Sequence, residues 1–407
     1  MTSSGIKTHL AEVRTDHSLP RPFYCSPEIY NRDVEAVLEP MWHIAGLAKQ
    51  IQALGDYFLF NSLGEEIILV RGENEEIHAF YNVCRHRGSR ICLTETGNCT
   101  AFVCPYHAWR YGLDGQLQKV RLMAEDFEFQ QHNLHSCAVR TEEGIIFVSM
   151  ADNPPDFDGW ISPFKPYCQF HGIRATKSAK DLVVPTQANW KLVVENFIEC
   201  YHCLPSHPEY CSVHSKPKLL AAGAGTGSGP DEAQAEYQAE LGPWLKTIEK
   251  LGHPFWEGEF DDGGAMTRMP IGKGRLTESR DGKAMAPLLG EMREYDGGVS
   301  YLALNYLNYL FIANDYAMLL RFSPQDHEVT NVEATWLVDE QAEKGVDYDA
   351  EELVWLWQTT LDQDLTITEN NQRGVSSRRY SPGPYSQQEI MNKNFIKWYL
   401  RKLSHQQ

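Results

Sequence analysis

The chain has 407 residues, which is long enough for two or three domains, and 42% of them are apolar, which is enough for large buried cores. No apolar run is long enough to span a bilayer and residues 1–20 are too polar for a signal peptide, so we expect a cytoplasmic protein. The net charge of −18 disfavours nucleic acid and anionic membranes as partners.

The first part of the chain is predicted to begin with a poorly ordered lead over residues 1–20, followed by a helix from Glu28 to about Glu39. Between about residues 40 and 150, short apolar runs alternate with glycine-containing turns, which is typical of a β-rich module. The clearest predicted strands are 57–61, 66–71, 77–82 and 145–150.

Two loops in this module each combine one cysteine with one histidine. The first is Cys84-Arg85-His86, and the second, seventeen residues later, is Cys104-Pro105-Tyr106-His107. In a Rieske [2Fe–2S] cluster two thiolates hold one iron and two imidazoles hold the other. Cys84 and Cys104 would bind the first iron, and His86 and His107 the second. A zinc site is the alternative, although zinc fingers usually pair Cys with Cys and His with His.

Further cysteines lie outside this motif. In a reducing compartment we expect them to be free thiols, with a disulfide between Cys92 and Cys99 as the alternative. They are Cys25, Cys92, Cys99, Cys137, Cys168, Cys200, Cys203 and Cys211.

Prolines between residues 154 and 166 mark a boundary, beyond which helical and strand patterns are mixed. The glycine-rich stretch 221–229 is either a lid or a disordered loop, and it lacks the strand–helix context of a nucleotide-binding loop. Helices are predicted over 189–200, 351–374 and 386–403, and strands within 301–322 and over 331–338.

A second metal site is predicted after the helix of residues 189–200. His202 and His207 are five residues apart, and Pro205 would end the helix so that both imidazoles could reach one ion. Asp364 is the candidate third ligand, with Asp362 as its competitor. Two histidines and one carboxylate form the facial triad of non-haem Fe(II) oxygenases. Two histidines at this spacing are often ordinary residues, and it is their occurrence beside a Rieske motif that favours a metal site.

Together these motifs resemble the catalytic α-subunit of Rieske non-haem iron oxygenases over nearly the whole chain. The segments 195–208 and 364–374 resemble the branch that acts on quaternary ammonium compounds such as carnitine, glycine betaine and proline betaine (stachydrine). The resemblance implies an α+β protein with a lead and helix over 1–40, an all-β Rieske domain over 41–155 and a catalytic domain over 156–407. The catalytic domain would contain a helix-grip-like antiparallel sheet. The family pattern also favours Asp364 over Asp362.

The resemblance gives Glu199 a specific role. Ring-hydroxylating relatives usually carry Asp at this position, whereas Glu resembles the carnitine and betaine branch. By analogy Glu199 contacts His202 in its own subunit and His107 of the partner subunit, within a homotrimer that sets each cluster beside a neighbouring iron. The alternative is an ordinary surface glutamate on a helix.

The implied reaction is hydroxylation of an N-methyl group by O₂, which ends in N-demethylation of a betaine and release of formaldehyde. A separate NAD(P)H-dependent flavin and iron–sulfur reductase would supply the electrons. An aromatic ring-hydroxylating dioxygenase α-subunit is the first alternative. A Rieske electron carrier is the second, which the long segment after the module argues against.

Aromatic faces suit a quaternary ammonium substrate, through cation–π attraction. The predicted strands of the catalytic part are rich in aromatic residues, most of which we expect in the sheet core. Arg321 or Arg373 is a candidate partner for a substrate carboxylate. The aromatic candidates are Tyr301, Tyr306, Tyr309, Phe311, Tyr316, Phe322 and Trp336.

Overall fold

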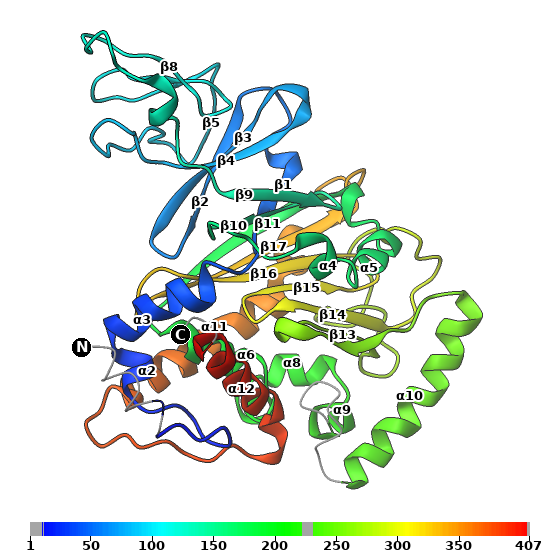
Figure 1. The fold of residues 1–407 in the computed structure, drawn as a ribbon. Coiled ribbons are helices and arrows are strands. Elements are labelled where there is room, and N and C mark those ends of the chain that lie inside the picture. The colour runs from blue at the N-terminus through cyan, green and yellow to red at the C-terminus, as the bar shows by residue number, and fades with distance from the viewer. Residues whose placement is uncertain (1–9, 11, 222–230, 405–407) are drawn as a thin grey trace. The chain divides into compact units, whose positions relative to one another are not determined.

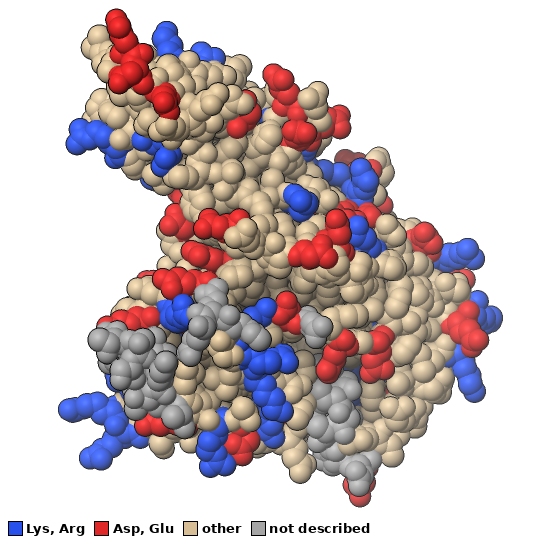
Figure 2. All heavy atoms as spheres, in the orientation of Figure 1, with Lys and Arg blue, Asp and Glu red and all other residues tan. Residues whose placement is uncertain are grey.

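The computed structural model of the protein describes residues 10, 12–221 and 231–404. The chain divides into two compact units, of which one comprises Met1–Val37 and Pro163–Gln407 and the other Leu38–Ser162 (Figure 1). In the described ranges no helix is both long and apolar enough to cross a membrane. Figure 2 shows acidic and basic side chains interspersed on the face that it draws.

The unit Leu38–Ser162 contains three small antiparallel sheets. The first has the order β4-β3-β2-β5 (Ile77–Tyr81, Glu65–Arg71, Asp56–Ser62 and Thr96–Asn98). The second has the order β6-β7-β8 (Phe102–Val103, Arg110–Tyr111 and Leu117–Lys119). The third has the order β1-β10-β9 (His43–Leu47, Ile145–Ser149 and Ala138–Glu142). The four predicted strands are confirmed as β2, β3, β4 and β10.

Tight turns fix the register of this unit. Ser62 pairs with Glu65 across the hairpin between β2 and β3. The two turn residues, Leu63 and Gly64, both have positive φ angles, 57° and 77°. Such two-residue turns match the right-handed twist of the flanking strands.

The larger unit is built on one seven-stranded antiparallel sheet, as expected for an α+β catalytic domain. Its order is β11-β17-β16-β15-β14-β13-β12. In that order the strands are Thr176–Thr186, Thr330–Asp339, Ala317–Pro324, Asn308–Ile312, Gly298–Asn305, Ala265–Pro270 and Glu257–Glu259.

Helices α6 (Trp190–Phe197) and α11 (Ala350–Val375) contact each other and lie against the sheet (Figure 1). Asn189 caps α6 by accepting a hydrogen bond from the Lys191 amide, and Asp349 caps α11. At the other end of α6, Phe197 packs on Tyr309 with ring centroids 4.8 Å apart. These contacts place the C-terminal end of α6 over the sheet, beside α11.

The remaining helices of this unit are mostly short. They are α2 (Pro22–Cys25), α3 (Pro27–Asp33), α5 (Lys165–Phe170), α7 (Cys203–Ser206), α8 (Pro208–Val213), α9 (Lys216–Ala221), α10 (Asp231–Leu251) and α12 (Ile390–Ser404). Helix α4 (Phe157–Ile161) belongs to the smaller unit. The predicted helices at 189–200, 351–374 and 386–403 correspond to α6, α11 and α12.

Of the two expectations for the N-terminal part, the helix is confirmed and the poorly ordered lead is wrong for the residues that the structure describes. The predicted helix 28–39 is α3, which continues as a π-helical turn over Val34–Leu38. Residues 12–20, expected to be poorly ordered, pack on the larger unit, because Leu19 is fully buried and the Ser18 amide donates to the Gly383 carbonyl at 3.0 Å. The glycine-rich stretch 221–229 lies outside the described residues except for Ala221.

Candidate metal centres

The two cysteine–histidine loops of the smaller unit have matching backbone geometry. The Gly88 amide donates to the Cys84 carbonyl at 2.9 Å, and the Ala108 amide donates to the Cys104 carbonyl at 3.0 Å. Gly88 and Ala108 both have positive φ, 74° and 58°. Each loop therefore turns back on its cysteine in the same way, although only the first has glycine at the left-handed position.

The loops bring the four predicted cluster ligands together as two pairs, one of cysteines and one of histidines. Cys84 and Cys104 are both buried, and the Nδ1 atoms of His86 and His107 are 3.1 Å apart. The Tyr111 hydroxyl lies 3.3 Å from the Cys84 sulfur. Burial raises the pKa of the Cys84 thiol, so a thiolate at this position needs a cation to stabilise it. Two thiols on one side and two imidazoles on the other fit a Rieske cluster better than a single tetrahedral ion.

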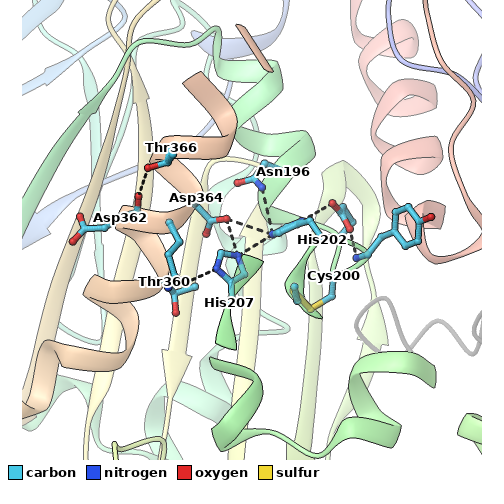
Figure 3. A network of polar contacts seen from close by, with 12 residues as sticks. Asn196, Cys200, His202, His207, Thr360, Asp362, Asp364 and Thr366 are labelled. Atoms are coloured by element: carbon cyan, nitrogen blue, oxygen red, sulfur yellow. Dashed lines mark hydrogen bonds and ion pairs between the residues drawn. A yellow bond between two sulfur atoms is a disulfide. The ribbon is translucent and has the colours of Figure 1, made fainter. Parts of the chain in front are cut away.

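The predicted mononuclear site is formed by three side chains from two parts of the larger unit. The Nε2 atom of His207 lies 3.0 Å from Nε2 of His202 and 3.1 Å from Oδ1 of Asp364. The third separation, from His202 Nε2 to the same carboxylate oxygen, is 3.4 Å. Figure 3 shows the three groups converging between the α6–α7 segment and α11. This is the donor set of a facial triad.

The outer nitrogen of each imidazole is held by a neighbouring side chain. The Nδ1–H of His202 donates to Oε1 of Glu199 at 2.6 Å, and Nδ1–H of His207 donates to Oε1 of Gln363 at 2.8 Å. Gln363 in turn donates to Glu209 at 2.7 Å. These contacts leave both Nε2 atoms facing Asp364, in the tautomer that a metal ion requires.

The charges of the three ligands also fit a cation. Burial favours the neutral imidazole of His202, but the hydrogen bonds to Asp364 and Glu199 outweigh it and raise its pKa to about 9. Burial likewise opposes ionisation of Asp364, yet His202 and His207 outweigh it and lower the pKa of this carboxyl. Positive charge is therefore stabilised at the point where the ligand atoms meet.

Asp362, the competing aspartate, is separated from this site. Its side chain points away from the two imidazoles (Figure 3), and its backbone carbonyl accepts a hydrogen bond from the Thr366 hydroxyl at 3.1 Å. The structure also places Gln363, Glu209 and Asn196 around the ligands, three residues that sequence reasoning missed. Only the position of Gln363 beside Asp364 could have pointed to one of them.

The expectation of free thiols is wrong for Cys200 and Cys203, which form a disulfide. The turn after α6 brings their Cα atoms to 4.9 Å, within the range that a disulfide spans. The other cysteines, including Cys92 and Cys99, are unbonded. The disulfide therefore brackets the loop that carries His202.

A cavity of about 280 Å³ opens beside the three ligands. Of the predicted aromatic candidates, Tyr301, Tyr309 and Phe311 line it, whereas Tyr306, Tyr316, Phe322 and Trp336 lie in the core and do not. Three further aromatic side chains, from α6, α8 and α11, complete the wall and were not foreseen. They are Phe197, Tyr210 and Trp357.

The two arginines considered as carboxylate partners are placed elsewhere. Arg321 pairs with Glu333 on the neighbouring strand. Arg373 is exposed and lies 3.6 Å from Glu369 one turn earlier in α11. Neither lines the cavity, so that expectation is wrong.

Comparisons with known proteins agree with this geometry. Residues 173–405 match the family described as the ring hydroxylating alpha subunit (catalytic domain), and residues 41–137 match the Rieske [2Fe-2S] domain. The glycine betaine monooxygenase oxygenase subunit of Pseudomonas aeruginosa (strain UCBPP-PA14) is 35% identical over 394 residues, which cover 95% of this chain and 90% of that protein.

Two other relatives are similar to this chain over different shares of its length. The corresponding subunit of Chromohalobacter salexigens is 37% identical over 96% of this chain and 86% of its own length. The carnitine monooxygenase oxygenase subunit of Escherichia coli (strain K12) is 32% identical over 47% of this chain and 53% of its own.

Solved structures share the fold. A quaternary ammonium Rieske monooxygenase, described in terms of carnitine oxidation and inter-subunit electron transfer, superposes with a TM-score of 0.73 at 21% identity, covering 96% of both chains. A naphthalene 1,2-dioxygenase gives 0.70 at 19% identity, covering 96% of this chain and 93% of its own. The chain is therefore an oxidoreductase of the ring-hydroxylating α-subunit family, with a Rieske [2Fe–2S] domain and a catalytic domain of the mononuclear non-haem iron type.

Proposed function

We propose that the enzyme hydroxylates an N-methyl group of a betaine, namely glycine betaine or proline betaine. The observation that carries this proposal is the cavity, in which aromatic faces adjoin the three iron-binding side chains. Trp357 and Phe311 stack with ring centroids 4.9 Å apart, and their planes are 23° from parallel. Such π faces attract a quaternary ammonium group, most strongly where water is excluded.

In this proposal His202, His207 and Asp364 hold the mononuclear iron, and Cys84, Cys104, His86 and His107 hold the cluster. When bound, these centres supply the electrons and the O₂ activation that the side chains themselves cannot supply. The aromatic wall orients one methyl group towards the iron ligands and excludes water. Glu199 holds the Nδ1 proton of His202.

The atoms and electrons of the reaction balance. One oxygen atom of O₂ inserts into an N-methyl C–H bond, and the other leaves as water after uptake of two electrons and two protons. Cleavage of the C–N bond in the resulting N-hydroxymethyl group releases formaldehyde, a proton and the demethylated amine. Oxygenase subunits of this kind work with a separate reductase. We infer that an NAD(P)H-dependent flavin and iron–sulfur protein supplies these electrons, and that the chain acts as a homotrimer.

A panel of substrates tests the proposal. The enzyme, a compatible reductase and NADH would be incubated separately with glycine betaine, proline betaine, carnitine and benzoate. Formaldehyde released from a betaine, in step with NADH oxidation, is the expected result.

An aromatic ring dioxygenase is the second candidate, because a cavity with an apolar wall also suits an arene. It is favoured if benzoate or another arene yields a cis-diol while none of the betaines yields formaldehyde.

A further inference from the structure

A buried lysine faces the same cavity as the iron ligands. Lys218, on α9, is only 6% exposed, and it lines the cavity together with His202 and Asp364. Burying an ammonium group is costly unless a partner compensates its charge. The partners of Lys218 therefore indicate which charge a ligand of the cavity should carry near this residue.

The groups of the described residues that directly contact this ammonium are neutral. Its Nζ lies 3.1 Å from Nδ1 of His214 and 5.2 Å from the centre of the Tyr301 ring. Burial lowers the pKa of His214 to about 4, so the imidazole is neutral at physiological pH. Among the described residues, no carboxylate forms an ion pair with Lys218.

The nearest buried carboxylate, that of Glu278, is engaged by other groups. It accepts hydrogen bonds from the Tyr301 hydroxyl at 2.7 Å and from Nε1 of Trp357 at 3.3 Å, and it lies 3.1 Å from Nε2 of His214. His214 thus stands between Glu278 and Lys218. Glu278 stabilises the positive charge of Lys218 at a distance. The Lys218 ammonium still has N–H groups that can donate hydrogen bonds into the cavity.

We propose that Lys218 binds the carboxylate of the substrate, and so makes the site selective for zwitterionic betaines over quaternary ammonium compounds without an anion. This inference rests on the proposed function. With the ammonium end of a betaine on the aromatic wall, its carboxylate would supply the missing counter-ion. A substrate without that anion would leave the Lys218 ammonium without a counter-ion and add a second cation to the cavity, which costs binding energy.

The other charged residues of the cavity do not take this role. Glu257 and Glu259 also line it, on the exposed edge strand β12, and Glu199 lines it beside His202. All three are anionic, so they attract the ammonium end of a substrate and repel its carboxylate. Lys218 is the one cationic Lys or Arg side chain among the described lining residues.

Glycine betaine and choline make a matched pair of substrates, because they share the trimethylammonium group and differ in carboxylate against hydroxymethyl. We would measure kcat/KM for both with the wild-type enzyme, Lys218→Met and Lys218→Arg. Lys216→Met is the control, since Lys216 is an exposed lysine of the same helix that does not line the cavity. Iron content and the thermal midpoint would be recorded for each variant.

We expect Lys218→Met to lower the betaine-to-choline ratio of kcat/KM by about 10- to 100-fold, the range expected for loss of one charged hydrogen bond. The loss should fall on KM for glycine betaine. Lys218→Arg should restore most of the ratio, and Lys216→Met should leave it unchanged. If Lys218→Met loses iron or stability, Lys218→Gln is measured instead, because it keeps a donor while removing the charge.

The measurements distinguish an error about Lys218 from an error about N-demethylation. If the wild-type enzyme demethylates glycine betaine but the folded Lys218 variants keep its ratio, Lys218 is not the carboxylate partner. If the wild-type enzyme releases formaldehyde from no quaternary ammonium compound, the proposed function fails and the role of Lys218 fails with it.

Discussion

Nδ1 of His202 lies 2.6 Å from Oε1 of Glu199, on the side of the imidazole opposite the Nε2 atom that meets Asp364. The second oxygen of Glu199 accepts a hydrogen bond from the backbone amide of Tyr201. The loop that carries His202 therefore also holds the Glu199 carboxylate in place. A carboxylate in this position sets the tautomer of the ring and strengthens it as a metal ligand.

Glu199→Gln tests that relationship. The amide has nearly the same shape but no negative charge, so we expect both metal centres to remain and turnover to fall by about 10- to 100-fold. The measurement is formaldehyde formation, together with the rate at which the reduced Rieske chromophore is reoxidised after mixing with O₂ and substrate.

Glu236→Gln is the matched control, because Glu236 is an exposed glutamate of α10. It should behave as the wild type. Turnover and reoxidation of Glu199→Gln at wild-type rates would show that the charge on Glu199 has no part in the reaction.

Asp364→Ala should remove the mononuclear iron and leave the cluster in place. The carboxylate supplies the only anionic ligand of the triad, and its Oδ1 lies 3.1 Å from His207 and 3.4 Å from His202. Iron analysis and the visible spectrum measure the two centres separately. Asp362→Ala, two residues away and turned outward, should keep both. Full iron content in Asp364→Ala would reject it as a ligand.

Cys84→Ser should abolish the visible spectrum of the cluster. Cys84 is buried with its sulfur 3.3 Å from the Tyr111 hydroxyl, and an alcohol in its place is a poor ligand for iron. Cys92→Ser is the control, since Cys92 is also buried but lies outside the two ligand pairs. An unchanged spectrum in Cys84→Ser would mean that the cluster is held by other residues.

The buried carboxyl group of Glu195 should make the free energy of unfolding depend on pH. The carboxyl group is buried on α6, and it accepts hydrogen bonds from the hydroxyls of Tyr24 at 2.9 Å and Tyr385 at 3.1 Å. Burial outweighs those bonds and raises its pKa from 4.5 to about 7. Between these two pH values the folded protein keeps a proton that the unfolded chain has lost, so this group's contribution to the free energy of unfolding falls as pH rises.

Glu195→Gln removes that dependence, because the amide does not titrate. Between pH 5 and pH 7.5 its free energy of unfolding should fall less than that of the wild type, by up to about 3 kcal/mol. Denaturant titrations of both proteins at the two pH values measure this difference. Identical pH dependence in the two proteins would show that Glu195 is ionised when folded.

The sequence predicted the ligand-bearing parts because their signals are local. Each cluster loop carries its ligands within four residues, and the apolar spacing of α6 and α11 fixes which residues face the sheet. Edge strand β11 was not predicted, since its burial does not alternate over residues 176–180 and it contains Pro185, which an edge strand tolerates. Helix α10 was missed because Gly242 and Pro243 lie inside it.

The parts of the site that were missed depend on packing between distant segments. Trp357, Tyr210 and Lys218 reach the cavity from three different helices, and none has a neighbour in the sequence that marks it. The disulfide between Cys200 and Cys203 likewise follows from the turn after α6, which the residue pattern alone did not define.

A single turnover shows whether the enzyme itself demethylates a betaine. The enzyme would be reduced chemically without its reductase, mixed with O₂ and either glycine betaine or proline betaine, and quenched. We predict formaldehyde in an amount equimolar with mononuclear iron, and loss of one methyl group from the betaine by mass spectrometry. Reoxidation of both centres with neither betaine demethylated would contradict it.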